Sequence, residues 1–189
     1  MPKESLHFIA LIPNRELREK IIAIEKDFEL RFNSSKALKV YPHITLKAPF
    51  KCPTGGRFEL LNWFSELVIH QRPFLINLKG YGAFDNKKSP VVVINPVVTK
   101  ELLNMQKELM IGFKSLFPGY VQPVDLKFTP HLTVAYRDLA PDKFAEAWKE
   151  YKDKSFNDVF EVNAIYLLEH DTKKWNVVAT CGLGSLSKT

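Results

Sequence analysis

The sequence predicts an α+β fold of two lobes that are related by a pseudo-twofold axis and share a central cleft. The first observation is a repeated phrase, since residues 42–46 read PHITL and residues 130–134 read PHLTV. The second is a repeated order of elements: strand, helix, His/Thr strand, helix, strand. The histidines of the phrase lie 88 residues apart, and the first strands of the two halves lie about 85 residues apart. A cleft on the axis would bring both histidines to one substrate.

In the first half, residues 6–12 form an apolar run typical of a buried strand, and Asn14 can cap the helix that follows. The apolar stripe of this helix consists of Leu17, Ile21, Ile24 and Phe28. A polar loop over 33–39 leads to the first His/Thr strand, and residues 53–56 introduce a second helix. The apolar side chains of the second helix are Leu60, Leu61, Phe64, Leu67 and Val68. An extended segment over 74–84 and a turn over 85–90 complete the half.

In the second half, residues 91–95 predict a strand, and Thr99 can cap a helix. This helix carries Leu102, Met105, Leu109, Phe113 and Leu116 on its apolar side. A long link over 117–128, able to form a wall of the cleft or a passive connection, leads to the second His/Thr strand. Pro141 begins a helix with Phe144, Trp148 and Tyr151, and strands are expected over about 159–168 and 175–183.

The repeated phrase carries the chemistry. Residues two apart on a strand share a face, so His43 lies with Thr45, and His131 with Thr133, while the alternate apolar residues point to a core. Random placement would give two copies of Pro-His-any-Thr in roughly 10⁻⁴ of such chains. Two imidazoles can act as general base and general acid, and two hydroxyls can donate to phosphate oxygens. The alternative is a duplicated structural strand whose histidines only satisfy hydrogen bonds in the core.

Length and composition predict a single bilobal domain over 1–189, with internal halves 1–86 and 87–189. The chain is 46% hydrophobic and 12% aromatic, which suffices for a packed core. It has no apolar run long enough to cross a bilayer and no leader pattern, so we expect a cytoplasmic protein without a membrane partner. Cys52 and Cys181 form no metal or disulfide pattern and are expected to be reduced thiols. No metal and no cofactor is implied.

The charge balance mildly favours a polyanionic partner. The formal net charge is +6, because 27 Lys and Arg exceed 21 Asp and Glu. Cationic side chains gain free energy when they neutralise phosphates and release counterions. The lysines are spread along the whole chain, however, and a solvated surface is the alternative reading of any single cluster.

The paired motif resembles the signature of the two-histidine phosphoesterase superfamily, which includes the LigT-like bacterial 2'-5' RNA ligases and RNA 2',3'-cyclic phosphodiesterases. Residues 8–13 (FIALIP), followed by a helix, are similar to the first strand and turn of that family, and residues 82–84 through 90–92 look like its central segment. The resemblance covers most of the chain. It implies a bilobal α+β fold, mainly antiparallel sheets with helices outside, a V-shaped cleft, and metal-free chemistry on cyclic or 2'-5' phosphodiesters.

Carried over residue by residue, the resemblance makes His43 and His131 the catalytic pair and Thr45 and Thr133 phosphate ligands. Many members have an arginine five residues after the second histidine, where this chain has Tyr136 and places Arg137 one position later. Strand alternation would put Lys47 on the face of His43 and Arg137 on the face of His131. Either can contact phosphate or simply reach solvent at a strand end.

Other aromatic and histidine side chains carry weaker signals. The candidates for stacking on a base are Phe50, Tyr81, Phe84, Tyr120 and Tyr136, with core packing as the alternative for most of them. The three remaining histidines, His7, His70 and His170, lack the motif context, and the sequence assigns them no role.

The sequence therefore predicts a metal-independent phosphoesterase acting on 2',3'-cyclic or 2'-5' phosphodiester bonds of RNA ends or small cyclic nucleotides. The same site run in reverse would be a 2'-5' RNA ligase. Other enzymatic substrates are ADP-ribose cyclic phosphate and 2'-5' oligoadenylate. From another class, the chain could be a non-catalytic RNA or nucleotide-binding module with the same phosphate cradle. We expect a monomer with no obligate protein partner.

Overall fold

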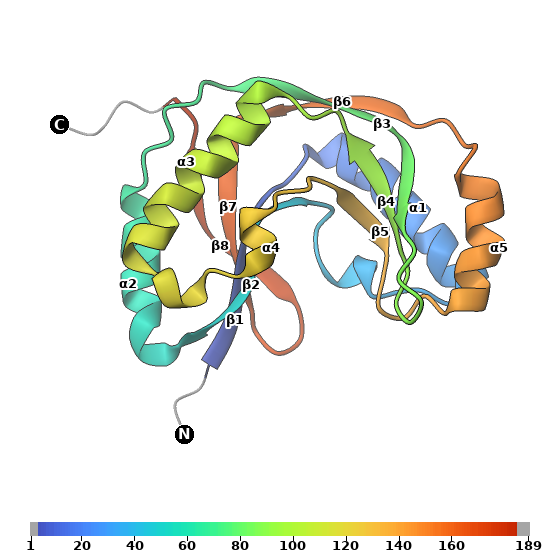
Figure 1. Cartoon of the computed structure of the whole chain (residues 1–189), viewed down its shortest axis with the longest axis horizontal. Coiled ribbons are helices and arrows are strands. Elements are labelled where there is room, and N and C mark those ends of the chain that lie inside the picture. Colours follow the sequence, from blue (N-terminus) through green and yellow to red (C-terminus); the bar gives the residue numbers. More distant parts are fainter. Residues whose placement is uncertain (1–3, 185–189) are drawn as a thin grey trace.

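The computed structural model describes residues 4–184, which form one curled eight-stranded sheet with helices over both ends (Figure 1). The strand order is β6-β3-β4-β5-β2-β1-β7-β8, and every neighbouring pair is antiparallel. Figure 1 shows α2 and α3 at one end of the sheet and α1 and α5 at the other. The α+β class with an antiparallel sheet is confirmed.

The strands are β1 (Glu4–Leu11), β2 (Ile44–Pro53), β3 (Phe74–Phe84), β4 (Val91–Pro96), β5 (Leu132–Ala135), β6 (Asn157–Val162), β7 (Ala164–His170) and β8 (Trp175–Gly182). The α-helices are α1 (Arg15–Phe32), α2 (Thr54–Glu66), α3 (Lys100–Leu116), α4 (Pro123–Leu126) and α5 (Pro141–Tyr151). Two short 3₁₀ turns, η1 (Ala37–Lys39) and η2 (Pro118–Tyr120), lie ahead of the two histidines.

Three helix starts are confirmed. The Asn14 side chain accepts from Leu17 N at 2.9 Å and begins α1, and the Thr99 hydroxyl accepts from Leu102 N at 3.3 Å and begins α3. Pro141 is the first residue of α5, where its missing N–H leaves no hydrogen bond unmade. Helix α2 ends at Glu66, so Leu67 and Val68 lie beyond it.

The strand expected over 159–168 is wrong. Two strands, β6 and β7, meet at Asn163, and they pair with different partners: β6 with β3 and β7 with β1. The Asn163 carbonyl leaves the ladder and accepts from Leu183 N at 2.8 Å. The apolar pattern does not reveal this change of pairing partner at Asn163, because it continues in the same way through both strands.

Strands from the two sequence halves interleave in the sheet. β3, from the first half, lies beside β4, while β7 and β8, from the second half, continue the sheet beyond β1. The boundary between residues 86 and 87 therefore falls within the β3–β4 hairpin. The link over 117–128 contains η2 and α4, and α4 contacts β2.

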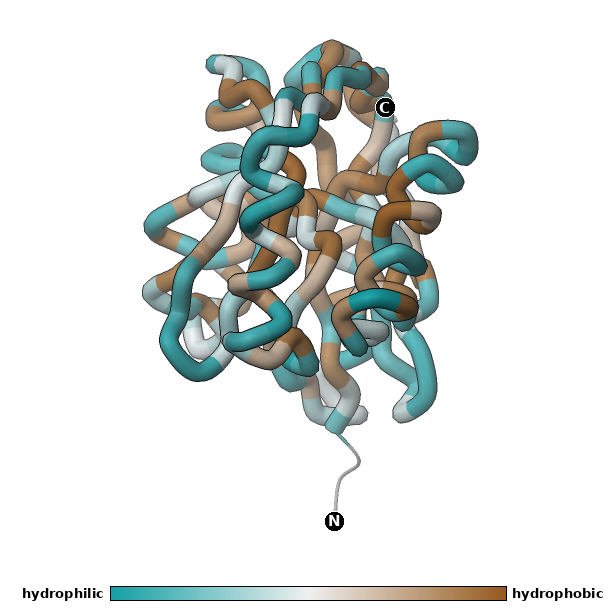
Figure 2. The backbone as a smooth tube through the Cα atoms, turned by 90° about the vertical axis from the view of Figure 1, so that its right-hand side faces the viewer, coloured by the Kyte–Doolittle hydropathy of each residue, from teal (hydrophilic) through white to brown (hydrophobic). Residues whose placement is uncertain are grey.

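The core lies between the sheet and its helices. Fully buried residues from both ends include Ile21 and Phe28 on α1, Phe64 on α2 and Phe113 on α3. Figure 2 shows apolar segments along the inner strands and hydrophilic segments on the outer loops. Burial of these side chains supplies the main favourable free energy of folding.

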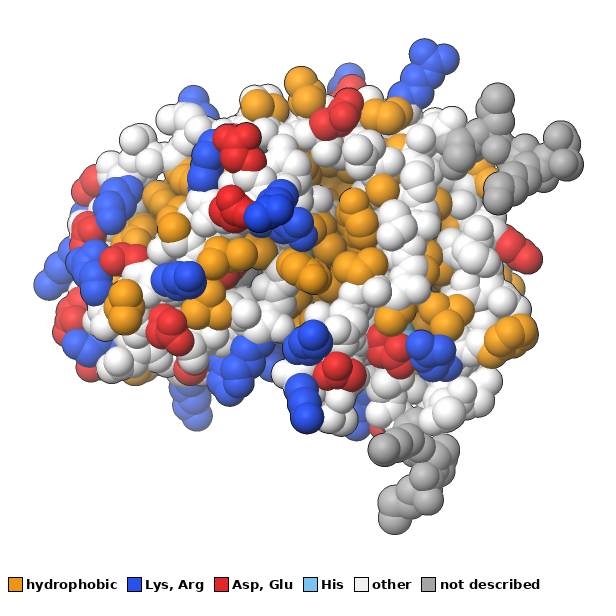
Figure 3. Space-filling model, turned by 180° about the vertical axis from the view of Figure 1, so that it is seen from behind, with side chains coloured by type: hydrophobic (Ala, Val, Ile, Leu, Met, Phe, Trp, Pro, Cys, Tyr) orange, Lys and Arg blue, Asp and Glu red, His pale blue; other side chains and the backbone are white. Residues whose placement is uncertain are grey.

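Charged side chains at the α1 and α5 end are largely paired with one another. Seen from behind, Lys and Arg mingle with Asp and Glu over this end (Figure 3). Arg31 pairs with Glu150, and Lys20 contacts Asp158 at 2.9 Å. Among the described residues no helix is long and apolar enough to cross a membrane.

Candidate active site

The two motifs lie side by side at the centre of the sheet, where β2 pairs with β5 through Ile44 and Leu132. Continuing this antiparallel register by one residue in each direction puts His43 opposite Thr133 and His131 opposite Thr45. Ile44 and Leu132 are fully buried in the core. All four motif side chains line one cavity on the other side. Each histidine therefore faces the threonine of the other copy.

Each imidazole is oriented by a hydrogen bond from its Nδ1 to a backbone carbonyl two residues earlier. Nδ1 of His43 lies 2.7 Å from the carbonyl of Tyr41, and Nδ1 of His131 lies 2.8 Å from the carbonyl of Thr129. A carbonyl only accepts, so Nδ1 carries the proton and Nε2 is left with a lone pair when the ring is neutral. The two rings thus present equivalent Nε2 atoms for proton transfer.

Aromatic rings flank both histidines. The Phe8 ring lies 4.8 Å from His43, and the Phe84 ring meets His131 edge-on at 5.1 Å. Burial, with a smaller contribution from the neighbouring His131, lowers the pKa of His43 to about 4, although the hydrogen bond to the Tyr41 carbonyl opposes this shift. His43 is therefore neutral at pH 7 and able to accept a proton.

The cavity around the motifs has a volume of about 880 Å³, within the usual size of small-molecule sites. Its lining includes both histidines, both threonines and Arg137. The threonine and arginine side chains bring neutral and cationic donors to the same space as the two imidazoles. Such a set can bind a phosphate and move protons on either side of it.

Lys47 is not brought to this cavity. Its side chain is fully buried, and its ammonium lies 3.0 Å from an Asp125 carboxylate oxygen and 5.2 Å from the centre of the Phe113 ring. The register of β1 against β2 shifts between Thr45 and Lys47, which is the mark of a β-bulge. The extra residue ends the alternation, so Lys47 turns from the face of His43 to the core. The expected phosphate contact of Lys47 is therefore not supported by its position.

Arg137 lines the cavity from an exposed position just after β5. Its φ of 63° is left-handed backbone, and its guanidinium lies 5.3 Å from the centre of the Tyr136 ring. The next residue, Asp138, accepts from the Ser34 hydroxyl and from Ser35 N, both at 2.9 Å. This carboxylate fixes the turn that presents Arg137 to the cavity.

The five aromatic candidates separate into two groups. Phe84 and Tyr136 line the cavity, whereas Phe50, Tyr81 and Tyr120 pack against other rings away from it. Of the histidines without motif context, His170 lines the cavity and packs edge-on against Trp175. His7 is fully buried beside Glu169, and the exposed His70 bonds Glu108 at 2.6 Å.

Sequence reasoning assigned no role in the site to several lining residues, among them Glu25, Tyr41 and Trp175. Glu25 had a visible signal, since it lies four residues after Ile21 and three before Phe28 on the buried side of α1. Its side chain is 1% exposed, no described residue donates a hydrogen bond to its Oε2, and burial raises its pKa to about 8. Tyr41 directly precedes the first motif but does not belong to it, and Trp175 lies in a stretch that carries no motif.

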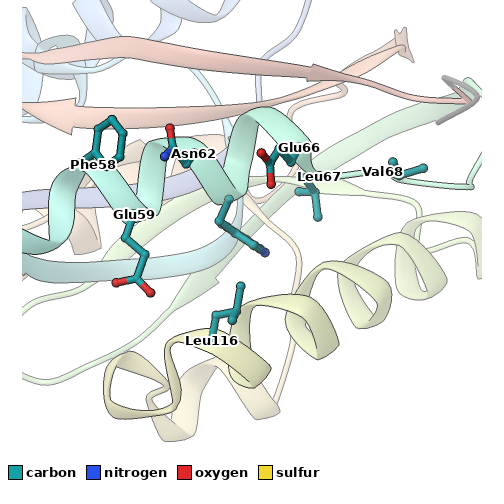
Figure 4. Close-up of a pocket in the computed structure, with 8 residues that line it drawn as sticks. Phe58, Glu59, Asn62, Glu66, Leu67, Val68 and Leu116 are labelled. Carbon is teal, nitrogen blue, oxygen red and sulfur yellow. The ribbon is translucent and has the colours of Figure 1, made fainter. Parts of the chain in front are cut away.

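Other parts of the described chain offer less chemistry. Cys52 and Cys181 are free, as predicted, and residues 4–184 contain no group of three or more His, Cys, Asp or Glu that could hold a metal ion. A second hollow, of about 550 Å³, lies between α2 and α3, and Figure 4 shows Glu59 and Leu116 from the two helices beside it. It contains no histidine.

Solved structures share this fold. The match to TT0787 of Thermus thermophilus has a TM-score of 0.70 at 20% identity, covering 95% of this chain and 98% of that one. Escherichia coli LigT complexed with 3'-AMP matches with a TM-score of 0.68 at 16% identity, over 97% of this chain and 100% of that one. The fold is thus LigT-like, an α+β architecture that here carries two His-x-Thr strands.

Sequence comparison identifies the family. A Bacillus cytotoxicus protein named "Putative phosphoesterase" is 28% identical over 183 residues, which cover 95% of this chain and 98% of the relative. A Bacillus mycoides protein of similar name is 27% identical over 179 residues, covering 93% and 95%. The family model described as "2'-5' RNA ligase superfamily" matches residues 13–174. The chain belongs to this superfamily of RNA ligase-like phosphoesterases.

Proposed function

We propose that the chain is a metal-independent phosphoesterase that acts on 2',3'-cyclic or 2'-5' phosphodiester bonds of RNA ends or small nucleotides. The observation that carries the proposal is the pair of equivalent imidazoles, each with Nδ1 bonded to a backbone carbonyl, in one cavity with two threonines. Such a pair supplies a base and an acid at once, which a single histidine cannot do.

In the hydrolytic direction, we assign His43 as the general base. Its Nε2 takes a proton from water as the water oxygen forms a bond to phosphorus. His131, as imidazolium, gives its proton to the ribose oxygen as the bond between that oxygen and phosphorus breaks. The low pKa of His43 supports this assignment, because a base must enter the reaction unprotonated. With a 5'-hydroxyl in place of water as the nucleophile, the base would take the proton of that hydroxyl as its oxygen bonds to phosphorus, and the acid would protonate the departing 3'-oxygen, which leaves a 2'-5' link.

The hydroxyls of Thr45 and Thr133 would donate to the non-bridging phosphate oxygens, where negative charge grows in the transition state. Arg137, at the exposed rim, would add a cation near the same oxygens. That LigT has been solved with bound 3'-AMP is consistent with a nucleotide phosphate in a cavity of this fold.

The test is to incubate the purified protein, in EDTA, with a short RNA that ends in a 2',3'-cyclic phosphate and to identify the product terminus. We expect opening to a 2'-phosphate. His43→Ala and His131→Ala should each remove most turnover with folding intact, and His70→Ala, an exposed histidine outside the cavity, should leave it unchanged. Activity that EDTA abolishes and a metal restores would overturn the mechanism. Binding without turnover would favour a nucleotide-binding module.

The pH dependence of kcat/KM tests the role of His43. A base with a lowered pKa stays competent until the pH falls through that pKa, so the acid limb should lie near pH 4. The measurement is kcat/KM for a cyclic nucleotide from pH 3.5 to 8. An acid limb near 6.5, the ordinary histidine value, would remove the support for assigning His43 as the base.

A further inference from the structure

Apart from the hollow between α2 and α3, a groove of about 380 Å³ adjoins the active-site cavity. The two hollows share three lining residues, Val40, Tyr41 and Trp175, so they lie next to each other. The remaining walls of the groove come from α1, from η1, and from the connection between β7 and β8.

The groove is basic. Lys39 ends η1, while Lys173 and Lys174 lie in the turn between β7 and β8, and all three side chains are exposed. No described carboxylate oxygen lies within 4 Å of their ammonium groups, in contrast to Lys143 on α5 and Lys154 just after it, which are both paired. Asp171 in the same turn bonds Lys173 N at 2.9 Å and Lys174 N at 2.8 Å, so its carboxylate is engaged by the backbone.

Two of the shared lining residues, Tyr41 and Trp175, are aromatic. Tyr41 is 44% exposed, and the guanidinium of Arg18 lies 5.2 Å from the centre of its ring. Trp175 packs edge-on against Phe8, the ring that also flanks His43. Cations beside aromatic rings in a groove are the usual construction for binding single-stranded nucleic acid, in which lysines follow the phosphates and rings stack on bases.

We propose that this lysine groove binds the RNA strand that leads to the reacting phosphate, so that an RNA end is preferred as substrate over a free cyclic nucleotide. The inference rests on the proposed function, since the reacting phosphate lies between the two histidines. A mononucleotide would occupy only the cavity and would gain nothing from Lys39, Lys173 and Lys174. An oligonucleotide would place its preceding phosphates beside them.

The experiment compares adenosine 2',3'-cyclic phosphate with a hexa-adenylate that ends in a 2',3'-cyclic phosphate. We expect the hexanucleotide to have the higher kcat/KM and the stronger salt dependence. Two or three phosphate contacts on a single strand predict a loss of roughly 7- to 20-fold between 50 and 200 mM salt, from a slope of about −0.7 per contact. The mononucleotide should change much less over the same range.

The matched variants remove three positive charges from different surfaces. Lys39→Ala, Lys173→Ala and Lys174→Ala together should abolish the preference for the hexanucleotide and leave mononucleotide turnover unchanged. The control is Lys100→Ala, Lys107→Ala and Lys114→Ala, since these exposed lysines on α3 line neither hollow. The control variant should retain the preference and its salt slope.

Anisotropy of a fluorescein-labelled hexa-adenylate with a 2'-phosphate end gives a readout that needs no turnover. The groove variant should bind at least tenfold more weakly than the control variant at 50 mM salt. Equal binding by the two variants, or equal kcat/KM for the two substrates, would overturn the groove proposal while leaving the phosphoesterase intact. If the parent protein turned over neither substrate but still bound the hexa-adenylate more tightly than the groove variant does, the proposed activity alone would be overturned.

Discussion

The first and second His-x-Thr strands present the same groups to the cavity but are supported differently. After the first motif, the strand turns Lys47 into the core, where it pairs with Asp125 in a fully buried ion pair. After the second motif, the chain leaves β5 and uses Asp138, whose partners are backbone and hydroxyl groups near the surface. The histidine and threonine side chains are therefore arranged pseudosymmetrically, whereas the contacts of Asp125 and Asp138 that hold the two strands in place are different.

The two supports cross between the halves. Asp125 precedes the second motif and accepts from Ala48 N, just after the first motif, at 2.8 Å. Asp138 follows the second motif and bonds residues 34–36, which precede the first. Each carboxylate therefore fixes a segment beside one motif to a segment beside the other. The relative position of the histidines thus depends on contacts between the halves, not on either strand alone.

The largest expected effect tests whether the two motifs are functionally equivalent. His43→Ala and His131→Ala should each lower kcat by about 10³-fold or more, because each removes one proton transfer. The double variant should be little worse than either single, since the two groups act in one step. The measurement is single-turnover cleavage of an RNA cyclic phosphate. Effects that multiply in the double variant would mean that the two histidines contribute independently and do not act as a unit.

The next effect comes from removing Asp125 from the buried ion pair with Lys47. Asp125→Ala should cost about 3–5 kcal/mol of unfolding free energy, because it leaves the Lys47 ammonium buried without a partner. Denaturant unfolding measures this loss. Lys47→Met combined with Asp125→Asn removes both charges and should be clearly more stable than Asp125→Ala. Asp153→Ala, at an exposed site, is the control and should stay within about 0.5 kcal/mol of the parent.

A third effect concerns Glu25, the buried carboxyl without a hydrogen-bond donor at Oε2 among the described residues. Its raised pKa means that the folded state binds its proton more tightly than the unfolded chain, so its contribution to stability falls as pH rises from about 4.5 to about 8. Glu25→Gln should therefore be more stable than the parent by about 3 kcal/mol at pH 7, with little difference at pH 4.5.

The control for Glu25 lies one helical turn further along α1. Glu29 is exposed, so Glu29→Gln should change the free energy of unfolding by no more than about 0.5 kcal/mol in thermal or urea unfolding. A stability difference between Glu25→Gln and the parent that is constant with pH would contradict a buried, protonated carboxyl.

The sequence predicted most of this fold because its signals are local. Helix caps at Asn14 and Thr99 and the alternation around His43 and His131 depend on neighbouring residues alone. It could not predict the crossing at Asn163 or the bulge that redirects Lys47, because both are decided by which strand pairs with which. Arg137 lines the cavity, but its neighbour Asp138 fixes that turn through partners about 100 residues away, which the sequence around Arg137 does not reveal.

The smallest expected effect comes from removing the half-buried Asp138 carboxylate. Asp138→Ala should cost about 1–2 kcal/mol, since it removes hydrogen bonds to residues 34–36 without leaving a buried charge. It should also lower kcat/KM several-fold, because those residues lead into η1 and the cavity wall at Ala37 and Val40.

Asp138→Asn separates the two consequences. The amide retains one acceptor for Ser35 N, so it should recover about half of the lost stability and most of the activity. The measurements are urea unfolding and kcat/KM on one RNA cyclic phosphate. If Asp138→Ala destabilised the protein as much as Asp125→Ala, the two supports would be energetically equal. The remaining difference between the two motifs would then be the burial that lowers the pKa of His43.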